Sequence, residues 1–429
     1  MSAPAGAGSQ PKQSAQSPEP RIGLALSGGG FRASIFHLGA ILRLEELGLM
    51  EKVAVISTVS GGSIVGVFYA IEMERCLQSK DPPGRIEAWR TISQRFLEAV
   101  DYNLRSRALL FTPVYHPLIF LKSTLLAAFR RGARSVLIQK EYDKWFFHDN
   151  TLDELPTVRT DEKARPVSGP KLVINTTSLI SGERKAFERD ANSNLAEMRT
   201  SNKNVLKLSQ VVGASAGVPV LFPPTPIAGD LLVDGGVADN QGIEGLAMAE
   251  CTHMIISDAC GQLELKHDPS TTETSVLFRV NSVLQHQIRN KLMRYLSEAK
   301  RRVLQPAPGE GKPDHPIETG KFQFAFFHLY TNLKDDSTVT HRLPTRYIQP
   351  VARIRTDLDQ FSHVERETLM YHGYTLADAL IRRWCGEIYP KKPPPLRTAP
   401  LFAKSQASEC GARAKDQLKK HLEAGAHGV

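Results

Sequence analysis

The chain has 429 residues, of which 41% are hydrophobic and 23% charged, a composition that excludes a fibrous or wholly disordered protein. Its formal net charge of +9 favours anionic partners, either nucleic acid or the acidic lipids of a membrane, without choosing between them. The five cysteines are scattered and form no CxxC pair, which argues against a disulfide framework or a zinc site. A reducing compartment fits this pattern, and we expect a cytoplasmic protein.

The two ends of the chain differ in composition from the rest. Residues 1–20 are rich in Ser, Ala, Gln, Pro and Gly without an apolar core, so we interpret them as a disordered leader and not as a signal peptide. Residues 391–429 form a basic tail, which leaves 21–390 as the folded domain, with a helical insertion at about 82–169. The most apolar segment, residues 108–129, contains prolines, a histidine and a lysine, which argues against a transmembrane helix.

The predicted elements alternate between strands and helices. Residues 22–26 form a short apolar run typical of a buried strand, and a glycine loop and a helix over 33–47 follow. A second buried strand at 53–57 leads through a sharp turn into a helix over about 63–74. This alternation predicts an α/β fold with a mostly parallel sheet and helices on both faces. Further strands are expected at residues 171–177, 231–233, 254–257 and 322–330, and further helices at 208–214, 243–249, 275–303 and 361–384.

Ser60 lies in the turn between the second predicted strand and the helix after it, in the run Ile-Ser-Thr-Val-Ser-Gly-Gly-Ser over residues 56–63. A serine in such a turn, followed by glycines, is typical of a nucleophile elbow. The N-terminus of the following helix favours an anion beside the serine. Thr58 stands where the usual G-x-S-x-G signature has its first glycine, and a Gly/Ser-rich turn that merely begins a helix remains the alternative.

Three consecutive glycines follow the first predicted strand in the run Leu-Ser-Gly-Gly-Gly-Phe-Arg over residues 26–32. Such a loop lets backbone N–H groups converge on one point, where they bind a phosphate or the oxyanion of a tetrahedral intermediate. The spacing matches neither a dinucleotide-binding motif nor a P-loop. A plain glycine turn is the alternative, and Arg32 either favours negative charge beside the loop or forms a structural ion pair.

Asp234 ends a short predicted strand and precedes two glycines. An acid at that position faces the carboxyl edge of an α/β sheet, where active sites form. An Asp-Gly pair on its own commonly marks only a turn, so its weight comes from the neighbouring motifs. The small residues and prolines of 213–224 are interpreted as scaffold lining the pocket.

Taken together and in their order along the chain, which is the glycine loop, the Ser60 turn, residues 213–224 and Asp234, the four motifs resemble those of patatin-like phospholipases, a family whose catalytic core is related to cytosolic phospholipase A2. The resemblance covers about residues 22–258, and residues 355–361 look like a stretch near the end of bacterial members. It implies a patatin-like three-layer α/β/α fold with helical insertions. It also implies a phospholipase A or lysophospholipase activity that uses a serine–aspartate dyad and an acyl-enzyme intermediate.

Carried over position by position, the resemblance implies Ser60 as the nucleophile and Asp234 as its base. The positions that match the family's oxyanion hole are Gly28, Gly29 and Gly30, with Arg32 as the arginine beside it. Two alternatives remain open. One is a transacylase that passes the acyl chain to a lipid alcohol, and the other is a non-catalytic lipid-binding relative.

The remaining expectations concern ligands and partners. We interpret His37 as structural, although a third catalytic member is the alternative, and the other histidines lack ligand spacing, so no metal and no cofactor are predicted. An acyl-ester lipid such as a phospholipid implies peripheral contact with an anionic membrane. Residues 104–147 and 289–302 mix apolar and basic residues, and they either lie in such an interface or pack on the core with a solvated basic face. No nucleic-acid motif is present, so no nucleic-acid partner is expected.

Overall fold

The structure, a computed structural model, describes the greater part of the chain. The described residues are 19–102, 104, 135–156, 169–189, 206–219, 221–261, 263, 267–268, 270–304, 322–339, 341–397, 419–420 and 422. Most of the predicted leader, residues 105–134 of the apolar and basic segment, and most of the basic tail lie outside the described residues. Those three predictions therefore stay predictions.

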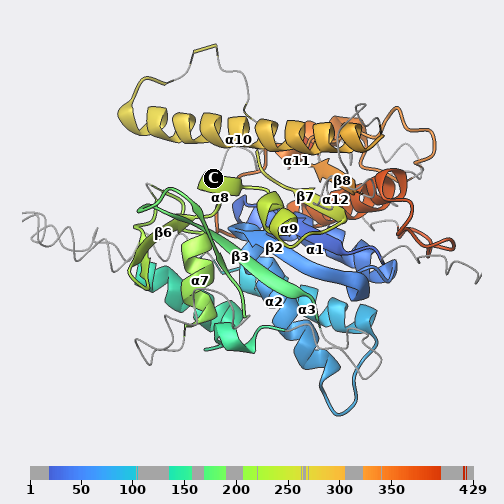
Figure 1. The fold of residues 1–429 in the computed structure, drawn as a ribbon, viewed down its shortest axis with the longest axis horizontal. Coiled ribbons are helices and arrows are strands. Elements are labelled where there is room, and N and C mark those ends of the chain that lie inside the picture. The colour runs from blue at the N-terminus through green and yellow to red at the C-terminus, as the bar shows by residue number, and fades with distance from the viewer. Residues whose placement is uncertain are drawn as a thin grey trace, which may run out of the picture.

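An eight-stranded sheet forms the centre of the molecule (Figure 1). Its order is β5-β6-β3-β2-β1-β7-β8, with β4 paired to β3 off this path. The five strands from β3 to β8 run parallel, whereas β4, β5 and β6 pair antiparallel. The predicted, mostly parallel sheet is thus confirmed. The strands are β1 Ile22–Leu26, β2 Val53–Val59, β3 Lys171–Ser178, β4 Arg184–Phe187, β5 Thr225–Ile227, β6 Asp230–Asp234, β7 His253–Asp258 and β8 Gln323–His328.

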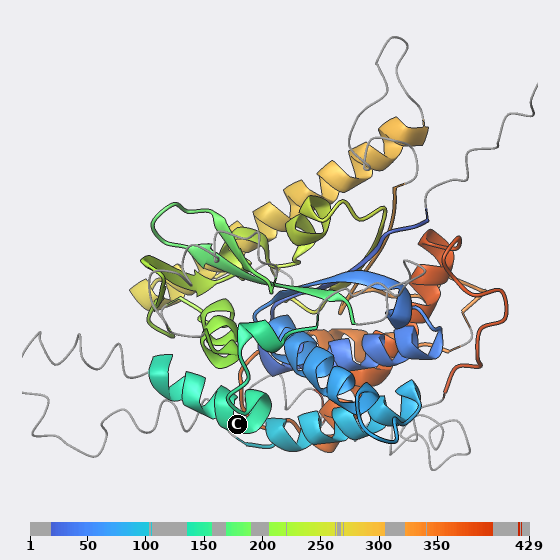
Figure 2. The same cartoon turned by 60° about the horizontal axis from the view of Figure 1, so that its bottom comes forward.

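Helices cover both faces of this sheet and complete the predicted three-layer α/β/α fold. Helices α9 and α10 lie on one side, and α1, α2 and α3 lie on the other (Figures 1 and 2). The helices are α1 Gly30–Glu46, α2 Gly61–Leu77, α3 Arg85–Val100, α7 Leu208–Ser215, α8 Gly236–Asp239, α9 Ile243–Met248, α10 Glu273–Leu304, α11 Thr345–Ala352 and α12 His363–Trp384. Among the described residues, no helix combines the length and apolar character needed to cross a bilayer.

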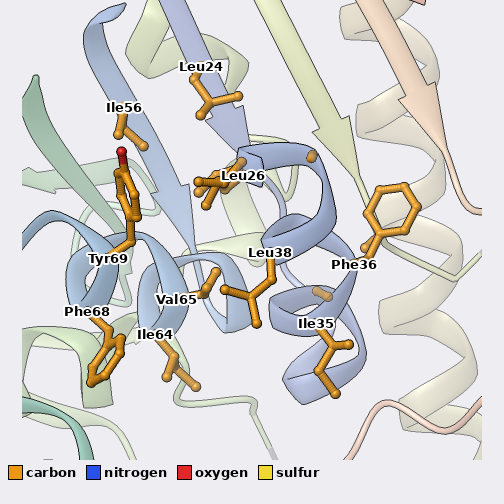
Figure 3. Packing of buried hydrophobic residues seen from close by; sticks show 14 of the residues in the cluster. Leu24, Leu26, Ile35, Phe36, Leu38, Ile56, Ile64, Val65, Phe68 and Tyr69 are labelled. Atoms are coloured by element: carbon orange, nitrogen blue, oxygen red, sulfur yellow. The ribbon is translucent and has the colours of Figure 1, made fainter. Parts of the chain in front are cut away.

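The central strands are mostly apolar because both faces of the sheet are buried, and their polar residues lie mainly near their carboxyl ends. Leu24 and Ile56 belong to the larger core, together with Leu38 of α1 and Val65 of α2 (Figure 3). Alternate positions such as Val55 point to the opposite face and form a second core with α9 and α10. This arrangement explains why the predicted strands read as continuous apolar runs, since alternation of polar and apolar residues requires one solvated face.

The register of β3 determines where the site forms. Asn175 pairs with Val59 of β2, and the next residue, Thr176, pairs with Asp234 of β6. Strand β4 pairs with both of these β3 residues, so it occupies the opposite edge, and β2 and β6 share one edge. Asp234 therefore takes the place beside β3 that the residue after Val59, which is Ser60, would have occupied had β2 continued.

Candidate active site

Ser60 has the backbone geometry of a nucleophile elbow. It is the N-cap of α2, and its φ of 51° and ψ of −119° place it in the left-handed half of the backbone map. Such a conformation is unusual for a residue with a side chain and is typical of functional turns. The side chain is buried, with 6% exposed. The first-turn N–H groups of α2 begin directly after it, so the turn places the hydroxyl beside the positive end of the helix dipole.

A network of buried hydroxyl groups holds this turn. The N–H of Ser60 donates to Oγ of Ser215 at 3.0 Å, and that hydroxyl donates to the carbonyl of Asn175 at 2.6 Å. Ser63 lies 2.9 Å from Ser215 and donates to Thr58 at 3.0 Å. Ser215 therefore joins the end of α7 to β3 and to the elbow. The sequence interpretation of this segment as scaffold did not identify Ser215, since one serine among small residues carries no distinctive signal.

Thr58, which departs from the G-x-S-x-G signature, fits because α2 has a glycine opposite it. Oγ1 of Thr58 donates to the carbonyl of Val173 at 3.2 Å, and the side chain is fully buried. A Cβ placed on Gly66 would lie 2.7 Å from the Thr58 methyl carbon, closer than real contacts allow. The missing side chain at position 66 thus provides the room that the usual glycine would otherwise provide at position 58.

The carboxylate of Asp234 is held against Ser60. It lies beside the side chain of Ser60 at a shared cavity, and Oδ1 accepts the N–H of Gly236 at 2.7 Å. Burial raises the pKa of Asp234 to about 6, and the neighbouring Ser60 hydroxyl and the Gly236 N–H oppose the increase only in part. The structure therefore brings the two predicted residues together, with the acid in a setting that favours proton uptake.

The glycine loop presents two free amides rather than three. Gly29 and Gly30 have φ values of 131° and 59°, and no described residue accepts a hydrogen bond from either N–H. The N–H of Gly28, in contrast, donates to the carbonyl of Asn240 at 3.0 Å. Gly29 and Gly30 line a cavity together with Ser60, so their amides are available to a ligand there, and that of Gly28 is occupied.

Arg32 serves the structure in a way that the sequence did not indicate. Its guanidinium donates to the carbonyls of Ile354 at 2.7 Å, Ala259 at 3.0 Å and Ala352 at 3.2 Å. The partners are carbonyls, not the carboxylate of an ion pair, and burial lowers the pKa of Arg32 to about 10. The side chain joins α1 to two distant segments and is not among the residues that line the cavity.

His37 is structural, as the sequence analysis interpreted it. Its Nε2 lies 3.0 Å from the carbonyl of Ser27, which only accepts, so this nitrogen carries the proton. Nδ1 then accepts from the hydroxyl of Ser257 at 2.8 Å. Both ring nitrogens are used and burial lowers the pKa of His37 to about 4, so the ring is neutral and joins α1 to β7 and to the residue that follows β1.

Two cavities meet at Ser60. The polar cavity, of about 320 Å³, is lined by Ser60, Asp234 and a set of polar side chains, among them Asn240, Gln241, Arg279, Gln285, His286 and Arg289. The apolar cavity, of about 370 Å³, is lined by Ser60 and by Ala216, Val218, Leu221, Phe222 and Leu358. Residues 355–358 of the segment noted in the sequence line the apolar cavity, and Phe31 beside the glycine loop donates its N–H to the carbonyl of Asp357 at 3.1 Å.

The site contains no recognisable metal-binding group in the part of the chain that the structure describes. No set of three or more His, Cys, Asp or Glu side chains gathers there in a way that could hold an ion. The polar side chains of α10 were not among the predicted site residues. Only the fold brings this helix, which begins about forty residues after Asp234 in the sequence, over the cavity.

Comparison with known proteins gives one family and several solved structures. The model of a family described as patatin-like phospholipase matches residues 24–247. Human GIVD cytosolic phospholipase A2 is 12% identical with a TM-score of 0.42, and the alignment covers 95% of this chain and 60% of that one. VipD from Legionella pneumophila is 16% identical with a TM-score of 0.34, over 86% and 67%. The chain thus spans about three fifths of the human protein. No curated protein sequence gives a significant match.

The contact between Thr58 and Gly66 predicts a specific coupling. We expect Gly66→Ala to lower the free energy of unfolding by about 1–3 kcal/mol, since overpacking in a rigid turn outweighs the gain in helix propensity. In a Thr58→Ser background, which removes the methyl group and keeps the hydroxyl, the cost should largely disappear. Urea unfolding of the four proteins in a double-mutant cycle measures this, and equal costs in both backgrounds would show that another contact limits the site.

The raised pKa of Asp234 predicts a pH-dependent effect of Asp234→Asn on stability. The folded protein binds this proton more tightly than the unfolded chain, with pKa values of about 6 and 3.8, so wild type loses stability as pH rises between them. Asp234→Asn does not show this loss. The unfolding free energy of the variant minus that of wild type should therefore increase over that pH range, by a total that approaches about 3 kcal/mol above pH 6. Asp239, with a pKa also raised by burial to about 6, is present in both proteins and cancels. A difference in unfolding free energy that stays constant from pH 4 to pH 8 would contradict the assignment.

Proposed function

The chain belongs to the patatin-like phospholipase family, and from this we propose that it is a lipid acyl hydrolase with Ser60 as nucleophile and Asp234 as base. Family membership supports lipid hydrolysis in general. The single observation that carries the finer proposal is that the side chains of Ser60 and Asp234 lie beside each other on the wall of one cavity, at its junction with a second. A dyad buried in this way needs no histidine, which agrees with the structural role of His37.

In the first half of the proposed reaction, Asp234 takes the hydroxyl proton of Ser60 as Oγ bonds to the carbonyl carbon of an ester. The electron pair of the carbonyl moves onto its oxygen, and the resulting oxyanion accepts hydrogen bonds from the N–H groups of Gly29 and Gly30. Removal of one such donor in other hydrolases costs roughly 3 kcal/mol. The bond to the alcohol then breaks, and the proton on Asp234 passes to the leaving oxygen.

In the second half, water attacks the acyl-enzyme. Asp234 accepts a proton from the water as its oxygen bonds to the acyl carbon, and the same two amides hold the second oxyanion. Ser60 leaves as the fatty acid forms and recovers its proton from Asp234. Because both halves begin with an ionised Asp234, whose pKa is about 6, kcat/KM should increase with pH through about 6 and then level off.

A transacylase is the nearest alternative, because a lipid alcohol in place of water would accept the acyl chain from the same intermediate. Product analysis with an added acceptor separates the two reactions. A non-catalytic lipid-binding relative is the second alternative. In the sequence, only Thr58 supported this alternative. Because the Thr58 side chain fits opposite Gly66, that support is weakened.

Peripheral contact with an anionic membrane is the second part of the proposal. Helix α10 exposes four apolar side chains near its beginning, with exposed fractions between 42% and 56%: Val276, Leu277, Val280 and Leu284. A basic residue, the exposed Lys291, follows on the same helix. Apolar side chains that enter a lipid surface and cations that face acidic head groups are the pattern of an interfacial helix.

Ser60→Ala is expected to abolish activity without loss of the fold. We expect wild type to hydrolyse a p-nitrophenyl acyl ester and to be labelled at Ser60 by a fluorophosphonate, with both signals reduced at least about a thousandfold in the variant. Ser79→Ala, an exposed serine just beyond α2, is the matched control and should behave as wild type. Peptide mass spectrometry locates the label, and hydrolysis that persists in Ser60→Ala would refute the mechanism.

The double variant Leu277→Gln/Leu284→Gln tests the membrane contact. Burial of a leucine in an apolar medium is worth about 1.5–3 kcal/mol, so we expect binding to phosphatidylglycerol vesicles to fall at least about tenfold. Leu77→Gln, at the end of α2 with 37% of Leu77 exposed, is the control. Co-sedimentation measures the bound fraction. Unchanged binding of the double variant would exclude α10, and equal binding of wild type to neutral and anionic vesicles would exclude the electrostatic contribution.

A further inference from the structure

The two cavities divide the surroundings of Ser60 into chemically different halves. They share Ser60, Gly30, Val218 and Thr356, so a molecule whose reacting bond lies at Ser60 can extend into both. An ester has two sides, the acyl chain and the alcohol, and in a lipid these differ sharply in polarity. The polarity of each cavity therefore indicates which side of the ester it can hold.

The apolar cavity suits an acyl chain. Its wall is formed by the turn after α7, which contributes Ala216, Val218, Leu221 and Phe222, and by Leu358 on the other side. The two charged side chains that also line it, Arg355 and Asp357, lie 3.3 Å apart as an ion pair, so they satisfy each other. Apolar area of this kind favours the hydrocarbon part of a substrate.

The polar cavity suits the alcohol side and carries positive charge. Helix α10 contributes Arg279 and Arg289, and Asp234 is the one acidic side chain among the described residues that line the cavity. Phe, Tyr and Trp are absent from that lining, so it offers no aromatic cage for a quaternary ammonium group such as choline. Arginine is the side chain best suited to bind a phosphate through two hydrogen bonds.

Two buried polar atoms at this cavity, one of Gln241 and one of His286, have no hydrogen-bond partner among the described residues. Gln241 is 1% exposed, and its Oε1 accepts no hydrogen bond. Asn290 donates to Nε2 of His286 at 3.1 Å, so Nε2 acts as the acceptor and Nδ1 carries a proton that has no acceptor. Buried polar atoms are rarely left unpaired, so an unpaired acceptor and an unpaired donor indicate a polar ligand.

We propose that the polar cavity binds an anionic, phosphate-bearing lipid head group through Arg279 and Arg289 of α10, while the apolar cavity holds the acyl chain. This assignment rests on the proposed hydrolase function and adds to it a preference among lipids. Lipids with a phosphoglycerol head group are favoured, because Gln241 can accept from a head-group hydroxyl. Zwitterionic choline lipids lack the head-group hydroxyl that Gln241 would accept from. Uncharged acylglycerols lack the phosphate that Arg279 and Arg289 would bind.

Three substrates with the same short acyl chain, used below their critical micelle concentrations, test the preference without a membrane surface. They are lysophosphatidylglycerol, lysophosphatidylcholine and monoacylglycerol. We expect kcat/KM of wild type to be highest for the first. Arg279→Gln should lower the ratio of kcat/KM for lysophosphatidylglycerol to that for monoacylglycerol at least about tenfold, since a charge-assisted contact to phosphate is lost.

Arg294→Gln is the matched control, because it removes the same charge from an exposed position of the same helix. It should leave the ratio as in wild type. Arg289 is less suitable for substitution, since its Nε lies 3.5 Å from the buried carboxylate of Asp258, which would be left without its cation. Equal kcat/KM for the three lipids, or an equal change in both variants, would overturn the proposal.

A binding measurement separates this proposal from the hydrolase proposal. In a Ser60→Ala background, calorimetric titration with lysophosphatidylglycerol should show binding that Arg279→Gln weakens at least about tenfold and Arg294→Gln does not. If wild type cleaves no ester but this pattern appears, the catalytic proposal fails and the head-group site stands. If esters are cleaved and the two arginine variants bind alike, the head-group site fails and the hydrolase stands.

Discussion

One edge of β3 serves two strands in succession, and the rest of the site depends on this shared edge. Strand β2 pairs with it as far as Asn175, then leaves into α2 through the strained turn at Ser60. Strand β6 enters from the opposite direction and takes the next pairing position with Asp234. Backbone hydrogen bonds of the sheet, and not a flexible loop, therefore set the separation of the two side chains. Rigid elements of this kind hold reacting groups within the narrow tolerance that catalysis needs.

Asp234 and Asp239 are both buried, and burial raises both pKa values to about 6. Their partners differ, because Asp239 accepts three backbone N–H groups at the start of α9, whereas Asp234 accepts one, from Gly236, and lies beside the side chain of Ser60. The hydroxyl network through Ser215 and Ser63 binds the backbone of the elbow and not the carboxylate, which leaves Asp234 free to exchange its proton with a ligand.

Local patterns predicted much of this arrangement. The strand at Ile22–Leu26 and the turn at Ser60 follow from apolar runs broken by glycine, and Asp234 follows from a strand that ends in an acid before two glycines. The roles of Gly28 and Arg32 did not follow, because their partners are backbone carbonyls distant in the sequence. The carbonyl of Asn240 accepts the hydrogen bond of the Gly28 amide. Two carbonyls more than three hundred residues from Arg32 accept hydrogen bonds from its guanidinium. Patterns of residue type carry no information about such contacts.

The position of α10 in the chain separates the residues proposed to choose the lipid from the residues proposed to cleave it. The elbow, the glycine loop and Asp234 all lie within residues 24–247, the part that the family model matches, whereas Glu273–Leu304 comes after it. In the proposed function, the cavity wall that faces the alcohol side of the substrate is thus encoded apart from the residues proposed to cleave the ester. On that proposal, changes in this helix retune lipid preference over evolution while Ser60 and Asp234 stay intact, and an exchange of α10 between relatives is a direct route to engineered selectivity.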